Sequence, residues 1–222
     1  MSTPTKISIS KIGELDLSAE STPNGRYYTT PDGNRYPSVT TVLGQGNTWV
    51  KEWRAKVGDE HANLVSHQAT ARGSAMHNLC EKFLRREPID LSKETPLTKA
   101  YFLSVRKWMS ENIREPLAVE VALYSDVLRL AGRCDCIALV EPDNELHIID
   151  FKTSSDVKGS GDILDYRLQA TAYSLMLKER TGLFARNYTI VISSQAPIAQ
   201  TYHGKVLDHV EELIKRRKAF QE

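Results

Sequence analysis

The chain has 222 residues, 41% of them hydrophobic and 26% charged, so it is long enough to bury the core of one sizeable domain. Its net charge of +1 excludes a global attraction to nucleic acid, so any site for a polyanion must come from locally placed Lys and Arg. No apolar run is long enough to predict a membrane span, and three cysteines, an odd number, favour a reducing compartment over a disulfide framework.

Residues 1–24 predict a weakly structured arm in front of one domain over 25–222. The arm carries acids and has no apolar h-region, so it predicts neither a secretory signal nor a transit peptide. We therefore expect a cytoplasmic protein, in the host cytoplasm if it is phage-encoded. Two β-branched and aromatic runs then flank the turn 31–34 (PDGN) and predict a hairpin.

Residues 47–113 show helical periodicity and predict a helical lobe. The expected helices cover about 47–66, 67–87 and 95–113.

The first of these helices places basic residues among aromatic ones. Lys51 and Arg54 lie beside Trp49 and Trp53. This mixture suits a groove for single-stranded nucleic acid, where bases stack and phosphates are neutralised, so Lys51 and Arg54 are candidate DNA contacts. The alternative is an ordinary amphipathic helix with its apolar face in the core.

The periodicity then changes to that of strands, and 115–203 predicts the sheet core. We expect strands over 117–125, 129–140 and 145–153, a helix over 163–180, two short strands near 187–194 and 197–204, and a C-terminal helix within 205–222. This order of elements predicts an α/β fold with a mixed sheet.

The third predicted strand ends in a pattern that indicates chemistry. Asp150 and Lys152 are two apart, so their side chains project to the same face. A hairpin through the turn 141–144 puts Asp135 opposite a residue near 150. Two carboxylates that close are unfavourable unless one is protonated or a cation lies between them, and hard oxygen ligands favour Mg²⁺ or Mn²⁺ over zinc. The alternative is an ion pair at a strand end with no chemistry.

These residues resemble the core of the PD-(D/E)XK nuclease superfamily, written here as Asp135 followed by the DFK of 150–152 on the next strand. The later pair Gln169 and Tyr173 is similar to the QxxxY element of its RecB-like branch.

Two upstream segments extend the resemblance. Residues 72–77 (RGSAMH) and Glu81 resemble the RGxxxH…E helix of the RecB-like branch. Residues 36–43 (YPSVTTVL) are similar to the segment that opens the mitochondrial genome maintenance exonucleases and related phage nucleases. Together the elements cover about residues 25–203.

The resemblance implies a restriction-endonuclease-like fold and a metal-dependent nuclease. Asp135 and Asp150 would hold Mg²⁺ or Mn²⁺, joined by the backbone carbonyl of Phe151 and by His77. Lys152 would lie near the nucleophilic water and the scissile phosphate, where it lowers the pKa of the water or stabilises charge in the transition state. The alternatives are a plain salt bridge for Lys152 and a packed or surface position for His77.

The helix after DFK carries two further candidates. Gln169 and Tyr173 are four apart and share one helix face. The resemblance implies that they position Lys152 or the DNA backbone, with Gln169 in the catalytic set and Tyr173 as a DNA contact. The alternative is an amide and a phenol on a half-buried face.

Four more charged residues are candidates with simpler alternatives. Glu120, on the first strand of the meander, is either a further metal ligand or an outward polar residue. Glu81, one turn after His77, either orients that histidine or is solvated. Arg72 is a candidate phosphate contact because a guanidinium grips phosphate in a bidentate way, and Lys158 is a candidate DNA contact in the loop after DFK.

The cysteines argue against an iron–sulfur variant of this family. A [4Fe–4S] cluster takes four cysteines, whereas this chain has only Cys80, Cys134 and Cys136, and the last two flank Asp135 on a strand. We expect no cluster and interpret all three as small buried hydrophobes.

The function predicted is a metal-dependent DNA exonuclease that acts on single-stranded or end-bearing DNA in replication, recombination or repair, with a possible protein partner in those processes and no membrane. Three alternatives remain. They are a non-catalytic nucleic-acid-binding or recombination protein on the same fold, a metal hydrolase acting on RNA or a small phosphoester, and a structural ion pair. The choice of DNA over RNA depends on the resemblance alone.

Overall fold

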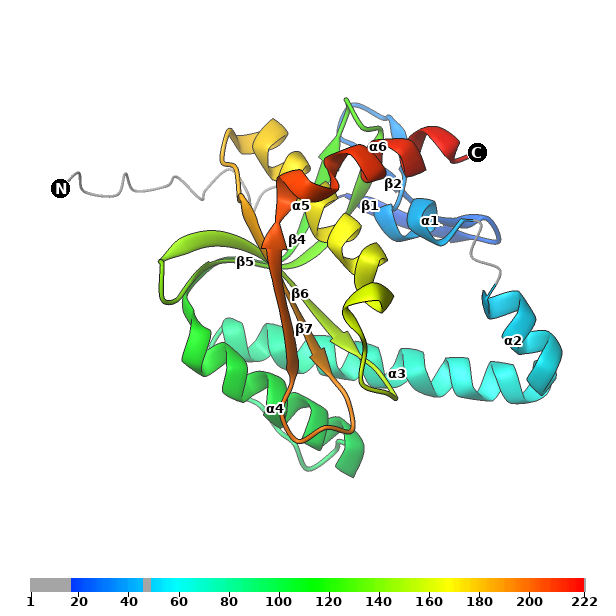
Figure 1. Ribbon diagram of the computed structural model, residues 1–222, viewed down its shortest axis with the longest axis vertical. Helices are drawn as coiled ribbons and strands as arrows, with labels where there is room; N and C mark the ends of the chain where they lie inside the picture. The colour runs from blue at the N-terminus through cyan, green and yellow to red at the C-terminus, as the bar shows by residue number, and fades with distance from the viewer. Residues whose placement is uncertain (1–16, 46–48, 222) are drawn as a thin grey trace.

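The computed structural model describes residues 17–45 and 49–221, and its centre is a five-stranded mixed sheet of order β4-β5-β6-β7-β8 (Figure 1). Neighbouring strands are antiparallel except β6 and β7, which are parallel. The strands are β4 Ile113–Ser125, β5 Leu130–Val140, β6 Glu145–Thr153, β7 Asn187–Ser193 and β8 Gln200–Lys205. The predicted α/β fold with a mixed sheet is confirmed.

Helices cover both faces of the sheet (Figure 1). On one face lie α3 Asp59–Leu84 and α4 Pro96–Asn112, and on the other α1 Val39–Gly44, α5 Leu164–Thr181 and α6 Val210–Ala219, with short 3₁₀ turns η2 Ser160–Ile163 and η3 Val206–His209 before α5 and α6. Strand β6 shows the alternation of a strand buried on both faces. Ile148 packs in the core under α5, whereas Ile149 and Phe151 pack in the core under α3 and α4.

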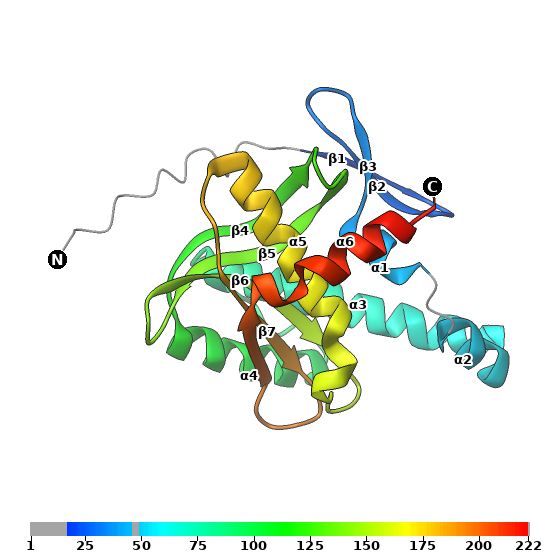
Figure 2. The same cartoon turned by 45° about the horizontal axis from the view of Figure 1, so that its top comes forward.

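A small second sheet precedes the main one in the chain and packs at its edge (Figure 2). It consists of β1 Ser18–Thr22, β2 Gly25–Thr29 and β3 Arg35–Pro37. Tyr28 and Tyr36 pack on Tyr124 and Ala131 of the main sheet. The predicted hairpin about 31–34 is confirmed, but the end of the predicted arm forms a strand, since β1 pairs along the whole of β2.

Residues 36–43 belong to the second of the two runs that predict the hairpin. Only the start of this segment is a strand, because its second half forms helix α1. The Oγ of Ser38 accepts a hydrogen bond of 3.0 Å from the backbone N–H of Thr41, which caps the first turn. The rest of the predicted arm, 1–16, lies outside the described residues.

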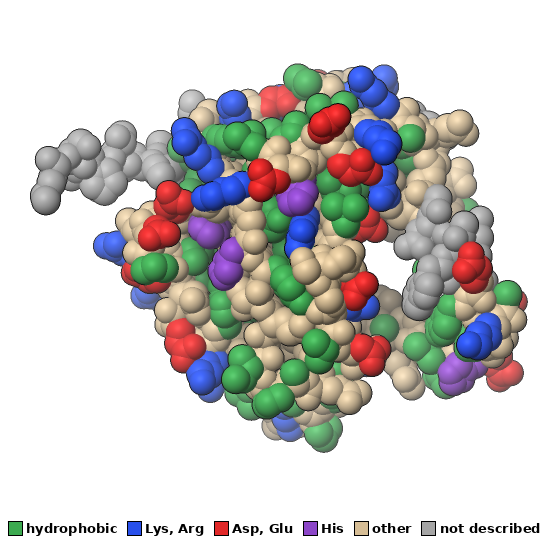
Figure 3. All heavy atoms as spheres, in the orientation of Figure 1, with side chains coloured by type: hydrophobic (Ala, Val, Ile, Leu, Met, Phe, Trp, Pro, Cys, Tyr) green, Lys and Arg blue, Asp and Glu red, His purple; other side chains and the backbone are tan. Residues whose placement is uncertain are grey.

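The first two helices of the helical lobe meet at Gly58, whereas the sequence predicts their boundary near residues 66 and 67. Helix α2 Trp49–Val57 ends at Gly58, whose φ of 85° ends the helix, and α3 then runs unbroken for 26 residues. Between 59 and 75 only Ala62 is buried, so α2 and the first half of α3 stand off from the sheet, as Figure 3 shows. The second half of α3 and α4 belong to the cover of the sheet. The predicted 95–113 helix is confirmed, capped by Thr95.

Acidic and basic side chains are mixed on the face drawn in Figure 3, and neither sign forms a large patch of its own there. This agrees with the net charge of +1. Among the helices that the structure describes, none combines the length and the apolar character that crossing a bilayer requires.

Candidate active site

The site forms where strands β5 and β6 separate. Cys136 and Ile149 are the last pair between them, whereas β6 stays paired with β7 as far as Thr153. Continuing the register places Asp135 opposite Asp150, as the turn 141–144 predicts. At this point the backbone N–H of Phe151 donates a 2.8 Å hydrogen bond to Asp135 Oδ2 instead of to a backbone carbonyl of β5. Two buried carboxylates therefore face the gap between the strands.

Glu120 reaches the same gap through an irregularity in β4. Its φ is 52°, and Val119 and Val121 on either side pack into opposite cores, although residues two apart on a regular strand share a face. Arg133 holds this backbone, because its Nη1 donates a 3.0 Å hydrogen bond to the carbonyl of Glu120. The register between β4 and β5 places Glu120 opposite Asp135, so carboxylates from three neighbouring strands lie in a row.

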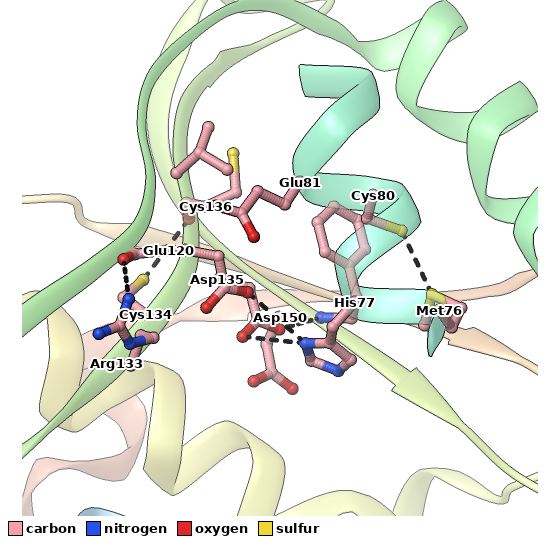
Figure 4. A network of polar contacts seen from close by, with 12 residues as sticks. Met76, His77, Cys80, Glu81, Glu120, Arg133, Cys134, Asp135, Cys136 and Asp150 are labelled. Atoms are coloured by element: carbon pink, nitrogen blue, oxygen red, sulfur yellow. Dashed lines mark hydrogen bonds and ion pairs between the residues drawn. The ribbon is translucent and has the colours of Figure 1, made fainter. Parts of the chain in front are cut away.

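Helix α3 brings His77 over this row (Figure 4). Its Nδ1 lies 3.5 Å from Asp135 Oδ1 and 3.8 Å from Glu120 Oε1. The helix is held in place by Met76 and Cys80, which are buried against the sheet on either side of His77. One imidazole nitrogen therefore lies within ion-pair distance of two carboxylates.

The electrostatics of this cluster favour a positive charge on His77. Burial alone would lower the pKa of His77, but the carboxylates of Asp135 and Glu120 outweigh it and raise that pKa to about 10. Burial works to raise the pKa of Asp135, yet His77 and Lys152 keep it below its usual value. The two carboxylates thus favour the protonated form of His77, and His77 in turn favours the ionised form of Asp135.

Asp150 and Lys152 form a close ion pair beside the cluster. Lys152 Nζ is 2.6 Å from Asp150 Oδ1 and 2.6 Å from Oδ2, and the aspartate is 1% exposed. Burial and the nearby Asp135 raise the pKa of Asp150 to about 6, although Lys152 opposes this. Burial would lower the pKa of Lys152, but Asp150 and Asp135 raise it overall, so the ammonium is retained.

The donor atoms fit a divalent cation. One ligand atom from each of His77, Glu120 and Asp135 lies within 4.8 Å of the others. Two carboxylates and one imidazole suit a hard or borderline divalent ion. Asp150 is not in this group, yet its Oδ2 is buried and accepts no hydrogen bond of good geometry among the described residues. This oxygen lies 2.6 Å from Lys152 Nζ, so Lys152 is the cation beside Asp150 in this structure.

Comparison with known protein families identifies the family of this chain. Residues 91–219, more than half of the chain, match the model of the PD-(D/E)XK nuclease superfamily. The chain belongs to the PD-(D/E)XK nuclease superfamily. A search of curated proteins finds no match. A crystal structure of SSO0001 is similar over 82% of this chain and 76% of its own, at 13% identity and a TM-score of 0.37, which carries no argument.

Membership of the PD-(D/E)XK nuclease superfamily supports a metal-dependent nuclease with a nucleic-acid substrate, and the metal group brings together three of the predicted residues. Glu120, predicted with a simple alternative, joins His77 and Asp135 there. The carbonyl of Phe151 stays a prediction. Glu81 does not reach His77 in this structure, because its Oε1 pairs with Arg85 Nε at 3.0 Å.

Helix α5 carries the predicted pair Gln169 and Tyr173, and a contact of Tyr173 with DNA stays a prediction. Tyr173 is 3% exposed, and its hydroxyl accepts a 3.2 Å hydrogen bond from Gln169 Nε2. Tyr173 fixes Gln169, which is itself buried. A residue that we did not single out, Tyr166, has its ring centroid 5.3 Å from Lys152 Nζ. Its position three residues before Gln169 on the same helix was the available signal.

The predicted DNA contacts differ in whether their side chains are already hydrogen-bonded within the protein. The Nε of Arg72 is buried without a hydrogen bond among the described residues, and the side chain lines a cleft beside α4, near Tyr101. Arg54 is already engaged, because its Nη2 bonds Asp59 at 2.9 Å and Asn63 at 2.7 Å across the Gly58 break. The side chain of Lys51 lies outside the described residues.

Lys158 lies in the loop between β6 and η2, and strand β8 anchors that loop. The backbone N–H of Lys158 donates to Gln200 Oε1 at 2.9 Å, and its carbonyl accepts from Gln200 Nε2 at 2.9 Å. The main chain at Lys158 is thus fixed while the side chain stays half-buried at the rim.

The three cysteines are buried, and burial raises the pKa of each thiol. The Sγ of Cys134 donates to the carbonyl of Cys136 at 3.6 Å. This is the packing of small buried side chains.

Proposed function

We propose that this chain is a metal-dependent exodeoxyribonuclease that hydrolyses phosphodiester bonds near the ends of single-stranded DNA. The observation that carries the proposal is the convergence of His77, Glu120 and Asp135 beside the Asp150–Lys152 pair. The order of Arg72-Gly73, His77, DFK and the pair Gln169–Tyr173 supports a RecB-like enzyme with a role in DNA replication, recombination or repair.

His77, Glu120, Asp135 and Asp150 would hold a divalent cation, for which Mg²⁺ and Mn²⁺ suit the oxygen-rich donor set. When bound, such an ion supplies charge neutralisation at the phosphate and a water that loses its proton more easily. To serve as a ligand, His77 would have to be the neutral imidazole.

Lys152 supplies the second positive charge. Its ammonium is held by Asp150 on one side and lies beside the ring of Tyr166 on the other, so it is oriented before substrate arrives. From that position it donates hydrogen bonds to phosphate oxygens as negative charge grows on them. Gln169, held by the hydroxyl of Tyr173, would position Lys152 or the DNA backbone, as the resemblance implies.

The preference for ends and single strands rests on the segment that stands off from the core. Helix α2 and the first half of α3 run beyond the sheet, and the second half of α3 carries His77 (Figure 1). A strand that reached His77 by threading between this segment and the sheet would need a free end, which is why we propose an end-bearing substrate.

The decisive experiment compares end-labelled single-stranded, end-labelled double-stranded and closed circular single-stranded DNA, each with Mg²⁺, Mn²⁺ or EDTA. We expect metal-dependent cutting of linear substrates, short labelled products and no cutting of circles. Asp150→Asn is expected to reduce the rate by at least about 10²-fold. Asp143→Asn, which changes an exposed acid at the other end of the same hairpin, is the matched control and is expected to cut normally.

Three results would reject parts of the proposal. Efficient cutting of circles would reject exonuclease action while leaving the metal site intact. Preferential cutting of matched RNA would reject the choice of DNA. Binding without cutting by folded wild type at any metal concentration would favour the alternative, a non-catalytic nucleic-acid-binding protein.

A further inference from the structure

A cleft of about 480 Å³ opens beside the candidate metal ligands. Helix α3 forms one wall with Ser74, His77 and Asn78, and Glu120 of β4 lies at the base. The opposite wall is formed by Arg26, which comes from the small N-terminal sheet rather than from the nuclease core. The cleft therefore joins two metal ligands to a residue that the mechanism above does not use.

The backbone of Arg26 is held firmly. Its N–H donates a 2.9 Å hydrogen bond to Thr41 Oγ1, and its carbonyl accepts a 2.7 Å hydrogen bond from the N–H of Ser38. Gly25, with a φ of 123°, permits this approach, since a Cβ there would lie 2.3 Å from Thr41 Cγ2. The capped start of helix α1 thus fixes where Arg26 enters the cleft.

The guanidinium of Arg26 has no anionic partner in the described part of the chain. It is exposed, it lies 5.2 Å from the ring centroid of the buried Tyr28, and no carboxylate there comes within ion-pair distance of it. Stacking on a buried ring reduces the freedom of the side chain without neutralising its charge. A fixed, unpaired arginine next to a row of carboxylates is suited to an anion that arrives with the substrate.

Arg35 on the next strand provides the contrast. It also lies over a tyrosine, 3.9 Å from the ring centroid of Tyr27, but it pairs with Glu20 at 3.5 Å. In the register of β2 and β3, Arg35 is opposite Thr29, so it shares the face of Tyr27 and not that of Arg26 and Tyr28. The small sheet therefore presents one satisfied arginine away from the cleft and one unsatisfied arginine toward it.

We propose that Arg26 binds a backbone phosphate of the nucleic-acid strand, next to the phosphate held at the metal ligands, with Ser74 and Asn78 donating hydrogen bonds from the opposite wall. The ligand is a phosphodiester of a single strand. The inference rests on the proposed function, because it assumes that a nucleic-acid strand enters this cleft.

The test is the salt dependence of binding. A fluorescein-labelled oligothymidylate is titrated with protein in EDTA, and Kd is measured by fluorescence polarisation from about 50 to 300 mM NaCl. Each phosphate contact to a single strand contributes about 0.7 to the slope of log Kd against log salt. Arg26→Gln is expected to lower that slope by about 0.7 and to weaken binding about 5- to 50-fold at low salt. Arg35→Gln is expected to match wild type in both.

Arg26→Lys separates charge from geometry. We expect it to retain the wild-type slope while binding more weakly than arginine, because an ammonium cannot grip phosphate in a bidentate way. Thermal melting of each variant checks that α1 and the small sheet remain folded.

The outcomes distinguish a failure of the Arg26 phosphate subsite from a failure of the proposed nuclease function. If wild type binds and Arg26→Gln keeps the full slope, the phosphate subsite is overturned while the nuclease proposal stands. A loss of affinity with an unchanged slope and a lowered Tm would assign Arg26 a structural role and overturn the subsite as well. If folded wild type binds no oligonucleotide, the proposed function and the subsite fail together.

Discussion

The N–H of Phe151 donates to Asp135 Oδ2 at 2.8 Å, at the point where the backbone pairing of β5 and β6 has ended. The Asp135 carboxylate thus replaces a backbone carbonyl of β5 as the acceptor of this hydrogen bond. At this point the side chain of Asp135 lies between the two strands. Because Glu120 is turned into the same gap by its positive φ, the site is made from irregularities of a sheet that is otherwise regular. The catalytic candidates stand on strands and a helix, and only the rim stands on loops.

Metal binding is expected to stabilise the folded protein. An ion that binds only the native state adds about 2.7 kcal/mol to the free energy of unfolding at a concentration of about 100 Kd. We therefore expect Mn²⁺ to raise Tm in wild type, EDTA to reverse the rise, and Glu120→Gln to reduce it. Differential scanning fluorimetry measures this directly. Glu115→Gln, an exposed acid on the same strand, is the control, and an equal Mn²⁺ shift in the Glu120 variant would remove Glu120 from the ligand set.

The pH dependence of stability without metal follows from His77. Its pKa is about 10 in the folded protein and about 6.5 in the unfolded chain. Below pH 6.5 both states carry the proton and the stabilisation is complete. As pH rises from 6.5 to 10, the unfolded chain loses the proton first, so the stabilisation is progressively lost. Asp150, with a pKa near 6, titrates below this window.

The loss should be on the order of 2 kcal/mol, less than the full shift implies, since the His77 side chain is 30% exposed and partly screened. Urea unfolding in EDTA at several pH values between 6 and 10 measures it. His77→Gln is expected to flatten the curve over this range. A wild-type protein that gains stability on going from pH 7 to 9.5 would contradict the prediction.

The order of the elements and the pairing of Asp135 with Asp150 could be predicted because both depend on local pattern. A segment of alternating apolar and polar residues, a four-residue turn and a second such segment determine the register of a hairpin almost by themselves. The capped helix at Thr95-Pro96 is equally local, and its predicted bounds agree with α4 to within one residue at each end.

The burial of the Tyr173 side chain could not be predicted, because it depends on a residue of strand β5, which is far from helix α5 in the sequence. A Cβ at Gly132 would lie 2.9 Å from Tyr173 Cε1, so the glycine makes the space that the phenol fills. The same holds for Arg26, whose place in the cleft depends on how Tyr28 docks the small sheet against β4 and β5. Helical periodicity identifies a shared face but does not say what covers it.

Gly73 offers a test in which stability and activity change in opposite directions. It lies inside α3, and a Cβ there would meet only Thr153 Oγ1, at 3.8 Å. Gly73→Ala is therefore expected to stabilise the fold by about 0.5–1 kcal/mol. The new methyl would stand in the cleft that Gly73 lines, at the end of β6, so we expect a lower nuclease rate with a higher Tm.

Ser66→Ala, in the exposed first half of α3, is the control for helix propensity alone and should raise stability without lowering the rate. Equal activity of Gly73→Ala and wild type would mean that the substrate does not approach this turn of the helix.

Tyr166 is expected to act as a positioning residue for Lys152. The contact of the ammonium with the ring, 5.3 Å from Nζ to the centroid, is of a kind worth about 0.5–2 kcal/mol. Tyr166→Leu should therefore lower the nuclease rate about 2- to 30-fold at saturating DNA, and Tyr166→Phe should retain it, because the ring and not the hydroxyl makes the contact. Phe184→Leu, which removes the similar contact of Lys178 with Phe184 at 5.0 Å, is the matched control away from the site and should cut at the wild-type rate. If Tyr166→Phe lost as much activity as Tyr166→Leu, the hydroxyl would be the functional group, and Lys152 would be oriented by Asp150 alone.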